Sequence, residues 1–240
     1  MPRLLLLLVS LLALPACTLA DPTPAYRYRL TVEVETPQGL RTGSSVIEVE
    51  TAVSQGIPTP GSVQHRVRGE AVAVDLPGGK TLFALLRSPV DIDWASRVTF
   101  MLAPEGRDAD GDRFLGTYAN MLAMEGPITL PRTWPEGGGL PERTAYPMLV
   151  TFGDLSDPTS VEEVDPDDLA AAFGEGVRLK RITVELTEDA VTEGIAGRLG
   201  WLDAYREKWL NGRSTVYQDL TTDDLTAHLS AGSFSTEFAR

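Results

Sequence analysis

The chain has few of the side chains on which most enzymes depend. Its 240 residues include one cysteine, so no disulfide can form within the chain. They include two histidines, so catalysis with histidine as the general base would have to use His65 or His228. The sequence also lacks His-Glu-x-x-His, Gly-x-Ser-x-Gly, Gly-x-x-x-x-Gly-Lys-Ser/Thr and, after a strand, Gly-x-Gly-x-x-Gly. These absences argue against several common classes of hydrolase, nucleotide-binding protein and dehydrogenase.

Long hydrophobic runs and basic residues are scarce as well. The apolar run at the N-terminus, Leu4 to Leu14, has about eleven residues, well short of the ~20 that span a bilayer. Acidic residues outnumber basic ones by 34 to 21, which gives a net charge of −13. Nucleic acids and anionic lipid surfaces repel such a chain at long range. We therefore expect neither a transmembrane anchor nor a nucleic-acid partner.

What the N-terminus does contain is the pattern of an export signal. Arg3 precedes the apolar run Leu4 to Leu14, and the small residue Ala16 follows before Cys17. A basic start, a short apolar core and a small residue at the cut are the three parts of a secretory signal peptide. We predict that residues 1–16 are removed.

The placement of the cysteine adds a membrane anchor to this prediction. Leu14-Pro15-Ala16-Cys17 resembles the lipobox of bacterial lipoproteins. The resemblance implies cleavage between Ala16 and Cys17 and acylation of Cys17, and more than one acyl chain makes a stable anchor. With Thr18 after the cysteine, it further implies an outer-membrane lipoprotein that faces the periplasm. The alternative is cleavage after Ala20, which would discard the cysteine.

A short tether, residues 17–25, is expected to lead into a β-rich region. Tyr26 to Glu35 alternates apolar and polar residues with period two, which predicts a strand with one buried face. Val46 to Val53 reads as the return strand. Pro77-Gly78-Gly79-Lys80 predicts a hairpin before the apolar run Leu82 to Leu86, which has no polar face and is expected in the centre of a sheet. The first third is thus predicted to be an antiparallel β meander.

Two irregularities are expected in these strands. The apolar phase changes across Gly69, which predicts a bulge or a bend. A strand over Val177 to Leu186 slips in phase near Arg181, which predicts a second bulge.

Helices are expected mainly in the C-terminal half. Asp165-Pro166-Asp167-Asp168 places capping and acidic residues at a helix start that Gly174 closes. Ala190 to Leu210 is predicted to be mainly helical, and Asp223 to begin a short terminal helix. Asp91 to Leu102 fits either a helix or a strand. The sum is an α+β fold with one globular domain over residues 26–230 and a frayed end over 231–240.

No residue is predicted to be catalytic or to bind a metal, and no cofactor is expected. His65, between two valines on the apolar face of a strand, reads as a core-edge histidine, with a partly buried base as the alternative. His228 is expected to be exposed. Asp108 to Asp112 is a polar loop whose alternative is a calcium-stabilised loop. An acid-rich stretch supplies turn and cap residues, or alternatively a docking face, and comprises Asp154, Asp157, Glu162, Glu163, Asp165, Asp167, Asp168 and Glu175.

Two segments, residues 28–49 and 179–195, together with the region 146–174, are similar to stretches of uncharacterised proteobacterial lipoproteins. That group implies no activity, ligand or catalytic residue. We expect a non-catalytic lipoprotein that binds or scaffolds an envelope partner. The alternatives are an envelope hydrolase with two close carboxylates of perturbed pKa, and a small-ligand or lipid carrier with an apolar cavity of at least ~300 Å³.

Overall fold

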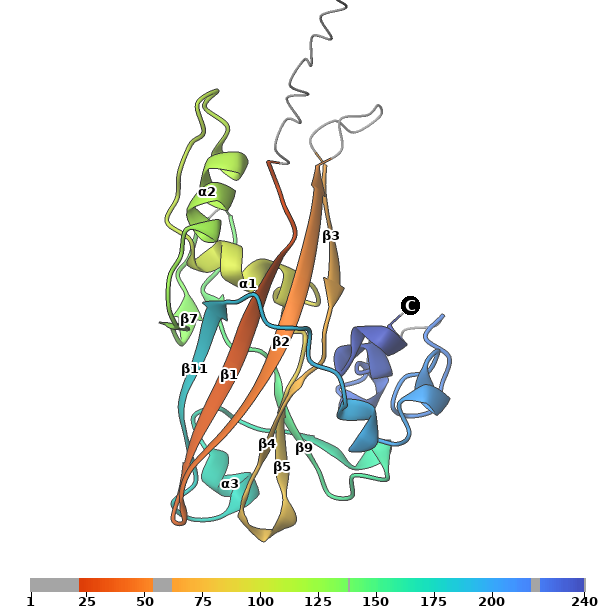
Figure 1. The fold of residues 1–240 in the computed structure, drawn as a ribbon. Coiled ribbons are helices and arrows are strands. Elements are labelled where there is room, and N and C mark those ends of the chain that lie inside the picture. Colours follow the sequence, from red (N-terminus) through yellow and green to blue (C-terminus); the bar gives the residue numbers. More distant parts are fainter. Residues whose placement is uncertain (1–21, 54–61, 138, 217–220, 240) are drawn as a thin grey trace, which may run out of the picture.

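The computed structural model describes residues 22–53, 62–137, 139–216 and 221–239. The predicted signal peptide, the cleavage site at Ala16 and the lipidation site at Cys17 lie outside these residues. In the described part, two antiparallel sheets face each other and an irregular C-terminal segment covers the second sheet (Figure 1).

The first sheet is built on the alternating segment that begins the domain. Tyr28, Leu30 and Val32 point inward and are fully buried, while the polar residues between them lie on the outer face. The strand order is β3-β2-β1-β11-β6, with β1 (Tyr26–Thr36), β2 (Gly39–Val53), β3 (Val63–Arg68), β6 (Ile128–Thr129) and β11 (Arg178–Leu186). The predicted bulge in β11 is confirmed by a register shift between Glu33 and Val34 of β1.

The second sheet contains the unbroken apolar run. Every residue of β5 (Thr81–Ala84) is buried, as expected for a strand in the interior of a sheet. The strand order is β10-β9-β5-β4, with β4 (Val72–Asp75), β9 (Leu149–Phe152) and β10 (Val161–Glu163). A separate hairpin pairs β7 (Thr133–Trp134) with β8 (Arg143–Thr144).

Two glycines fix how the sheets meet. Gly69, at φ +154°, joins β3 to β4 and so carries the chain from the first sheet to the second. The predicted bend is confirmed, and it divides the meander between two sheets. Gly43 of β2 lies so close to β4 that a Cβ there would be 2.2 Å from the carbonyl oxygen of Ala73.

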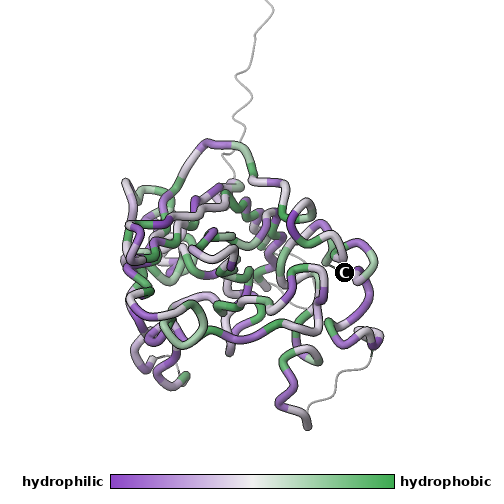
Figure 2. Tube along the Cα trace, turned by 90° about the horizontal axis from the view of Figure 1, so that it is seen from below, coloured by the Kyte–Doolittle hydropathy of each residue, from purple (hydrophilic) through white to green (hydrophobic). Residues whose placement is uncertain are grey.

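The side chains form two separate cores. The first core fills the space between the sheets and extends under α1 (Trp94–Leu102), α2 (Arg113–Leu122) and α3 (Leu169–Phe173). The second lies between the other face of the second sheet and the C-terminal segment. Hydrophobic and hydrophilic residues alternate along much of the chain (Figure 2). Since the second sheet is covered on both faces, its central strand has no solvated side.

Each α-helix follows an aspartate, and in α2 and α3 the side chain of that aspartate caps the helix. Asp93 precedes α1, so of the two alternatives for Asp91 to Leu102 the helix is the one formed. The Asp112 side chain accepts a hydrogen bond from the Leu115 N–H at 2.9 Å and caps α2. Asp168 caps α3, and Gly174 ends it as predicted. The α+β class and the antiparallel sheets are confirmed.

The prediction of a mainly helical segment over Ala190 to Leu210 is wrong. Only two short 3₁₀ turns form there, η3 (Ile195–Gly197) and η4 (Asp203–Tyr205). Ile195, Leu199 and Leu202 have the spacing of a helix in the sequence. In the structure, separate turns of the chain bury each of them against the second sheet, and no continuous helix is needed. The terminal helix expected from Asp223 is the 3₁₀ turn η5 (Leu225–Ala227), which Asp224 caps.

Both expected boundaries of the domain need correction. The C-terminal residues 231–239 are packed, not frayed, because Phe234 is fully buried in the second core and Thr236 donates its N–H to the Gly69 carbonyl. At the other end, the tether joins the domain before Tyr26. Thr23 is buried, and its hydroxyl donates to the Thr51 carbonyl at 3.2 Å.

Candidate ligand-binding pocket

The acid-rich stretch serves local structure. The Asp154 carboxylate accepts hydrogen bonds from the N–H and hydroxyl of Ser156, and these bonds lower its pKa. Asp157 caps the 3₁₀ turn Pro158–Ser160. Asp167 binds Arg132, with Nη2 at 2.7 Å from Oδ2, and this hydrogen bond lowers the pKa of Asp167. These contacts support the interpretation of the acids as turn and cap residues.

The loop from Asp108 to Asp112 is held together by hydrogen bonds within the loop. The Asp108 Oδ1 atom accepts the N–H groups of Asp110 and Asp112 at 2.9 and 2.8 Å. Across the residues that the structure describes, no three His, Cys, Asp or Glu side chains are grouped so that they could hold a metal ion.

The two histidines have different environments. The placement of His65 at the edge of the core is wrong: His65 is exposed, as are its neighbours in β3, and its Nδ1 lies 3.1 Å from the Thr51 hydroxyl across the β2–β3 pair. Its pKa is lowered, first because neighbouring groups partly desolvate the ring and then by the charge of Arg97. His228 was expected to be exposed, but it is half-buried with Nε2 2.7 Å from the Thr222 carbonyl oxygen. The difference arises because the C-terminal segment folds onto the second core.

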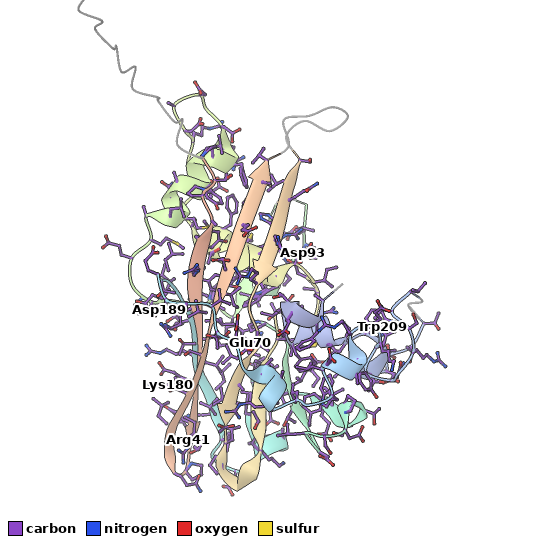
Figure 3. All side chains as sticks on the ribbon, turned by 45° about the vertical axis from the view of Figure 1, so that its right-hand side comes forward. Arg41, Glu70, Asp93, Lys180, Asp189 and Trp209 are labelled. Atoms are coloured by element: carbon purple, nitrogen blue, oxygen red, sulfur yellow. The ribbon has the colours of Figure 1, made fainter. Side chains whose placement is uncertain are left out.

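The outer face of the first sheet carries ion pairs. Glu33 lies 2.6 Å from Arg181 and 3.0 Å from Lys180, and the hydrogen bond from Arg181 lowers its pKa. The segment 187–194 follows β11 and crosses over β1 and β2, where Asp189 pairs with Arg29 (Figures 1 and 3). Paired charges of this kind hold strands and the crossing segment together.

A hydrolase with carboxylates needs one that keeps its proton, which requires a raised pKa. The carboxyl groups with a resolved change in the described residues all have a lowered pKa, caused by hydrogen bonds from arginine, serine or threonine: Glu33, Asp75, Asp154, Asp167 and Asp224. These five are therefore placed to stay ionised, and none of them is suited to protonate a leaving group.

A surface pocket of about 400 Å³ lies where the C-terminal segment meets the connection from β5 to α1. We call it the Trp209 pocket. Asp93, at the start of α1, and Trp209, in the C-terminal segment, both line it; Figure 3 labels the two residues. Its lining residues are Leu86, Arg87, Ile92, Asp93, Arg206, Trp209, Thr215, His228, Ser230, Gly232, Ser233, Phe238 and Ala239.

Arg87 is a half-buried cation in this pocket. Its Nη1 atom donates to the His228 carbonyl at 3.0 Å, and its Nε atom lies 3.4 Å from the Ser88 carbonyl. No carboxylate among the described residues lies within 4.0 Å of the guanidinium. Burial lowers the pKa of Arg87, and the nearby charge of Asp91 opposes this effect. Arg87 thus remains a cation that only neutral carbonyl groups contact.

The other charges of the Trp209 pocket are already paired. Arg206 lies over the Phe238 ring at 4.8 Å and binds Asp203 at 3.0 Å. Asp93 binds Arg97 at 3.2 Å. Arg87 is therefore the one arginine of the lining that forms no ion pair with a described carboxylate.

Exposed apolar side chains lie in or near the pocket in the sequence. Ile92 is 71 % exposed, Val90 is 66 % exposed and Val216 is 79 % exposed. Ile92 lines the pocket, Val216 follows the lining residue Thr215, and Val90 lies two residues before Ile92. Of these three, only Ile92 lines the pocket, and it places an exposed aliphatic side chain at the pocket edge.

Three other surface pockets have volumes of about 410 to 570 Å³. Each is lined by one more carboxylate than cations. The first has Arg66 and Arg68 with Glu70, Glu193 and Glu237, the second Arg27 with Glu48 and Glu188, and the third Arg132 with Glu163 and Asp165. Of these four pockets, only the Trp209 pocket has an excess of positive charge, in a chain whose net charge is −13.

Sequence reasoning did not find this pocket. Arg87, Trp209 and His228 are far apart in the chain and meet only because the C-terminal segment packs onto the second sheet. The one local feature in the sequence that points to the pocket is Arg87, a basic residue directly after the buried run Leu82 to Leu86.

In the part of the chain that the structure describes, no helix has the length and apolar character needed to cross a bilayer. Comparison with protein-family models, with curated proteins and with solved structures gave no match to this chain.

Proposed function

We propose that the chain is an exported lipoprotein whose domain binds an envelope ligand or partner without chemical conversion. The signal is cut before Cys17, and the acyl chains on Cys17 hold the protein on the outer membrane, facing the periplasm. The observation that carries this proposal is the position of the single cysteine, which directly follows a short export signal.

The packing of Thr23 supports a close anchor. Five residues, 18–22, separate Cys17 from Thr23, so even a fully extended link reaches at most about 20 Å. The Tyr118 hydroxyl of α2 donates to the Pro24 carbonyl at 2.9 Å, so the start of the described chain lies beside α2. On this proposal, that end of the domain faces the membrane and the opposite end points away from it.

The binding half of the proposal is supported by the Trp209 pocket. Its half-buried Arg87 and the exposed Ile92 at its edge are features of a recognition site. A carrier with its ligand between the sheets is less well supported, because large side chains such as Tyr28, Leu30 and Leu82 fill that space.

Acyl labelling and fractionation test the anchor. The wild-type chain, expressed in a Gram-negative host with radiolabelled palmitate, should carry the label and sediment with membranes. Cys17→Ser should lose the label and appear in the soluble fraction, and Thr18→Ser is the matched control that should behave as wild type. A Cys17→Ser chain that stays on the membrane would contradict the proposal.

A further inference from the structure

We propose that the Trp209 pocket binds a small organic carboxylate with an apolar body, and that Arg87 contacts the carboxylate group. This inference names the ligand class for the binding function proposed above and rests on that function. It does not depend on the anchor at Cys17.

The charge of the pocket selects an anion. A guanidinium has five N–H donors, and two of them are directed at the carbonyls of His228 and Ser88. The remaining donors form a planar fork that fits a carboxylate with two parallel hydrogen bonds. A half-buried guanidinium that lacks a carboxylate partner in the described chain is costly to keep, and a bound anion would compensate it.

The apolar part of the ligand is selected by the walls. The half-buried Trp209 supplies an aromatic side chain to the lining that Arg87 shares, and Ile92 offers an exposed aliphatic side chain at the edge. A ligand that covered these groups would remove apolar surface from water, which is the main driving force for binding at such sites. A simple inorganic anion would satisfy Arg87 but leave this surface exposed.

The size and surroundings of the pocket restrict the ligand further. A volume of about 400 Å³ suits a ligand of drug-like size or smaller. Because Asp93 and Asp203 are close and already paired with arginines, a ligand with several negative charges would meet repulsion. A singly charged carboxylate fits best.

The test uses 3-phenylpropionate as the probe and 3-phenylpropionamide as its uncharged match. The protein is the full chain carrying Cys17→Ser, which retains every residue that the structure describes. The readout is the indole N–H signal of Trp209 in a nitrogen-15 NMR spectrum. Trp94 and Trp201, whose indoles donate to the carbonyls of Ala145 and Leu155, serve as internal references.

We expect a saturable shift of the Trp209 signal with the carboxylate and none with the amide. Arg87→Met should weaken binding about tenfold or more, since a hydrogen-bonded charge pair is lost. Arg66→Met makes the same charge change on the exposed part of β3 and should leave affinity unchanged. Ile92→Ser, at a side chain that is 71 % exposed, should weaken binding several-fold without disturbing the core.

Two results would overturn the inference. One is equal binding of the amide and the carboxylate. The other is an equal loss of affinity in Arg66→Met and Arg87→Met. That result would mean that the net charge of the protein, and not the position of Arg87 in the pocket, determines the affinity for the carboxylate. If Arg87→Met does not fold, the amide comparison and Ile92→Ser decide. Membrane release is measured in a separate experiment. The ligand prediction can therefore be refuted while the lipid anchor is confirmed, and the anchor can be refuted while ligand binding is confirmed.

Discussion

Phe234→Ala is the substitution that most directly tests the packing of the C-terminal segment. The Phe234 side chain is fully buried, and its ring centroid lies 5.7 Å from Phe152, 5.6 Å from Trp201 and 6.2 Å from Phe83. Truncating a buried phenylalanine removes its transfer free energy and leaves a cavity, at a cost of about 3–5 kcal/mol. Domains are stable by about 5–15 kcal/mol, so the loss is a large fraction of the total.

The measurement is urea unfolding followed by tryptophan fluorescence, with thermal unfolding followed by circular dichroism. A loss of about 4 kcal/mol should lower the melting temperature by roughly 10 °C in a domain of this size. Val216→Ala is the control, because Val216 is 79 % exposed and its truncation should change stability by no more than about 0.5 kcal/mol. A Phe234→Ala effect below about 1 kcal/mol would refute the described packing of residues 231–239.

Three further substitutions test single contacts. Gly43→Ala should destabilise the domain by about 1–3 kcal/mol in urea unfolding, because the new Cβ would lie 2.2 Å from the carbonyl oxygen of Ala73; wild-type stability would show that β2 and β4 are not so close. Asp168→Ala removes the N-cap of α3 and should cost about 1 kcal/mol, with Asp168→Asn retaining most of it. Glu33→Gln tests a pH dependence. The hydrogen bond from Arg181 lowers the pKa of Glu33 in the folded state, so its stabilisation is full above the unfolded pKa, near about 4.3, and is lost as the pH falls through the folded value. Unfolding curves of wild type and Glu33→Gln should therefore differ at neutral pH and converge in acid, and a constant difference would contradict this assignment.

Elements could be predicted from the sequence where a pattern of neighbouring residues is enough to determine the local backbone structure. The alternation from Tyr26 to Glu35 predicts β1 because each apolar residue on one face is buried. The phase change at Gly69 predicts the bend because a positive φ favours glycine. The acidic residues from Asp165 to Asp168 predict a helix that Gly174 ends; the helix forms, but its cap is Asp168, so it begins three residues later than a start at Asp165 and Pro166 would give.

The rest depended on contacts between distant residues. Ala190 to Leu210 has helical spacing, but its apolar residues are buried one turn at a time against the second sheet, and this tertiary packing overrides the local pattern. The Trp209 pocket has the same origin, since Arg87 and Trp209 are joined only by the packing of the second core. No local signal states which distant segments will meet.

The mass of the N-terminal peptide of the mature protein tests the central claim most directly. After expression in a Gram-negative host and proteolysis, the account predicts a first residue of Cys17 whose mass is increased by a diacylglycerol and a third acyl chain. An unmodified peptide that begins at Asp21, after the alternative cut behind Ala20, would contradict it.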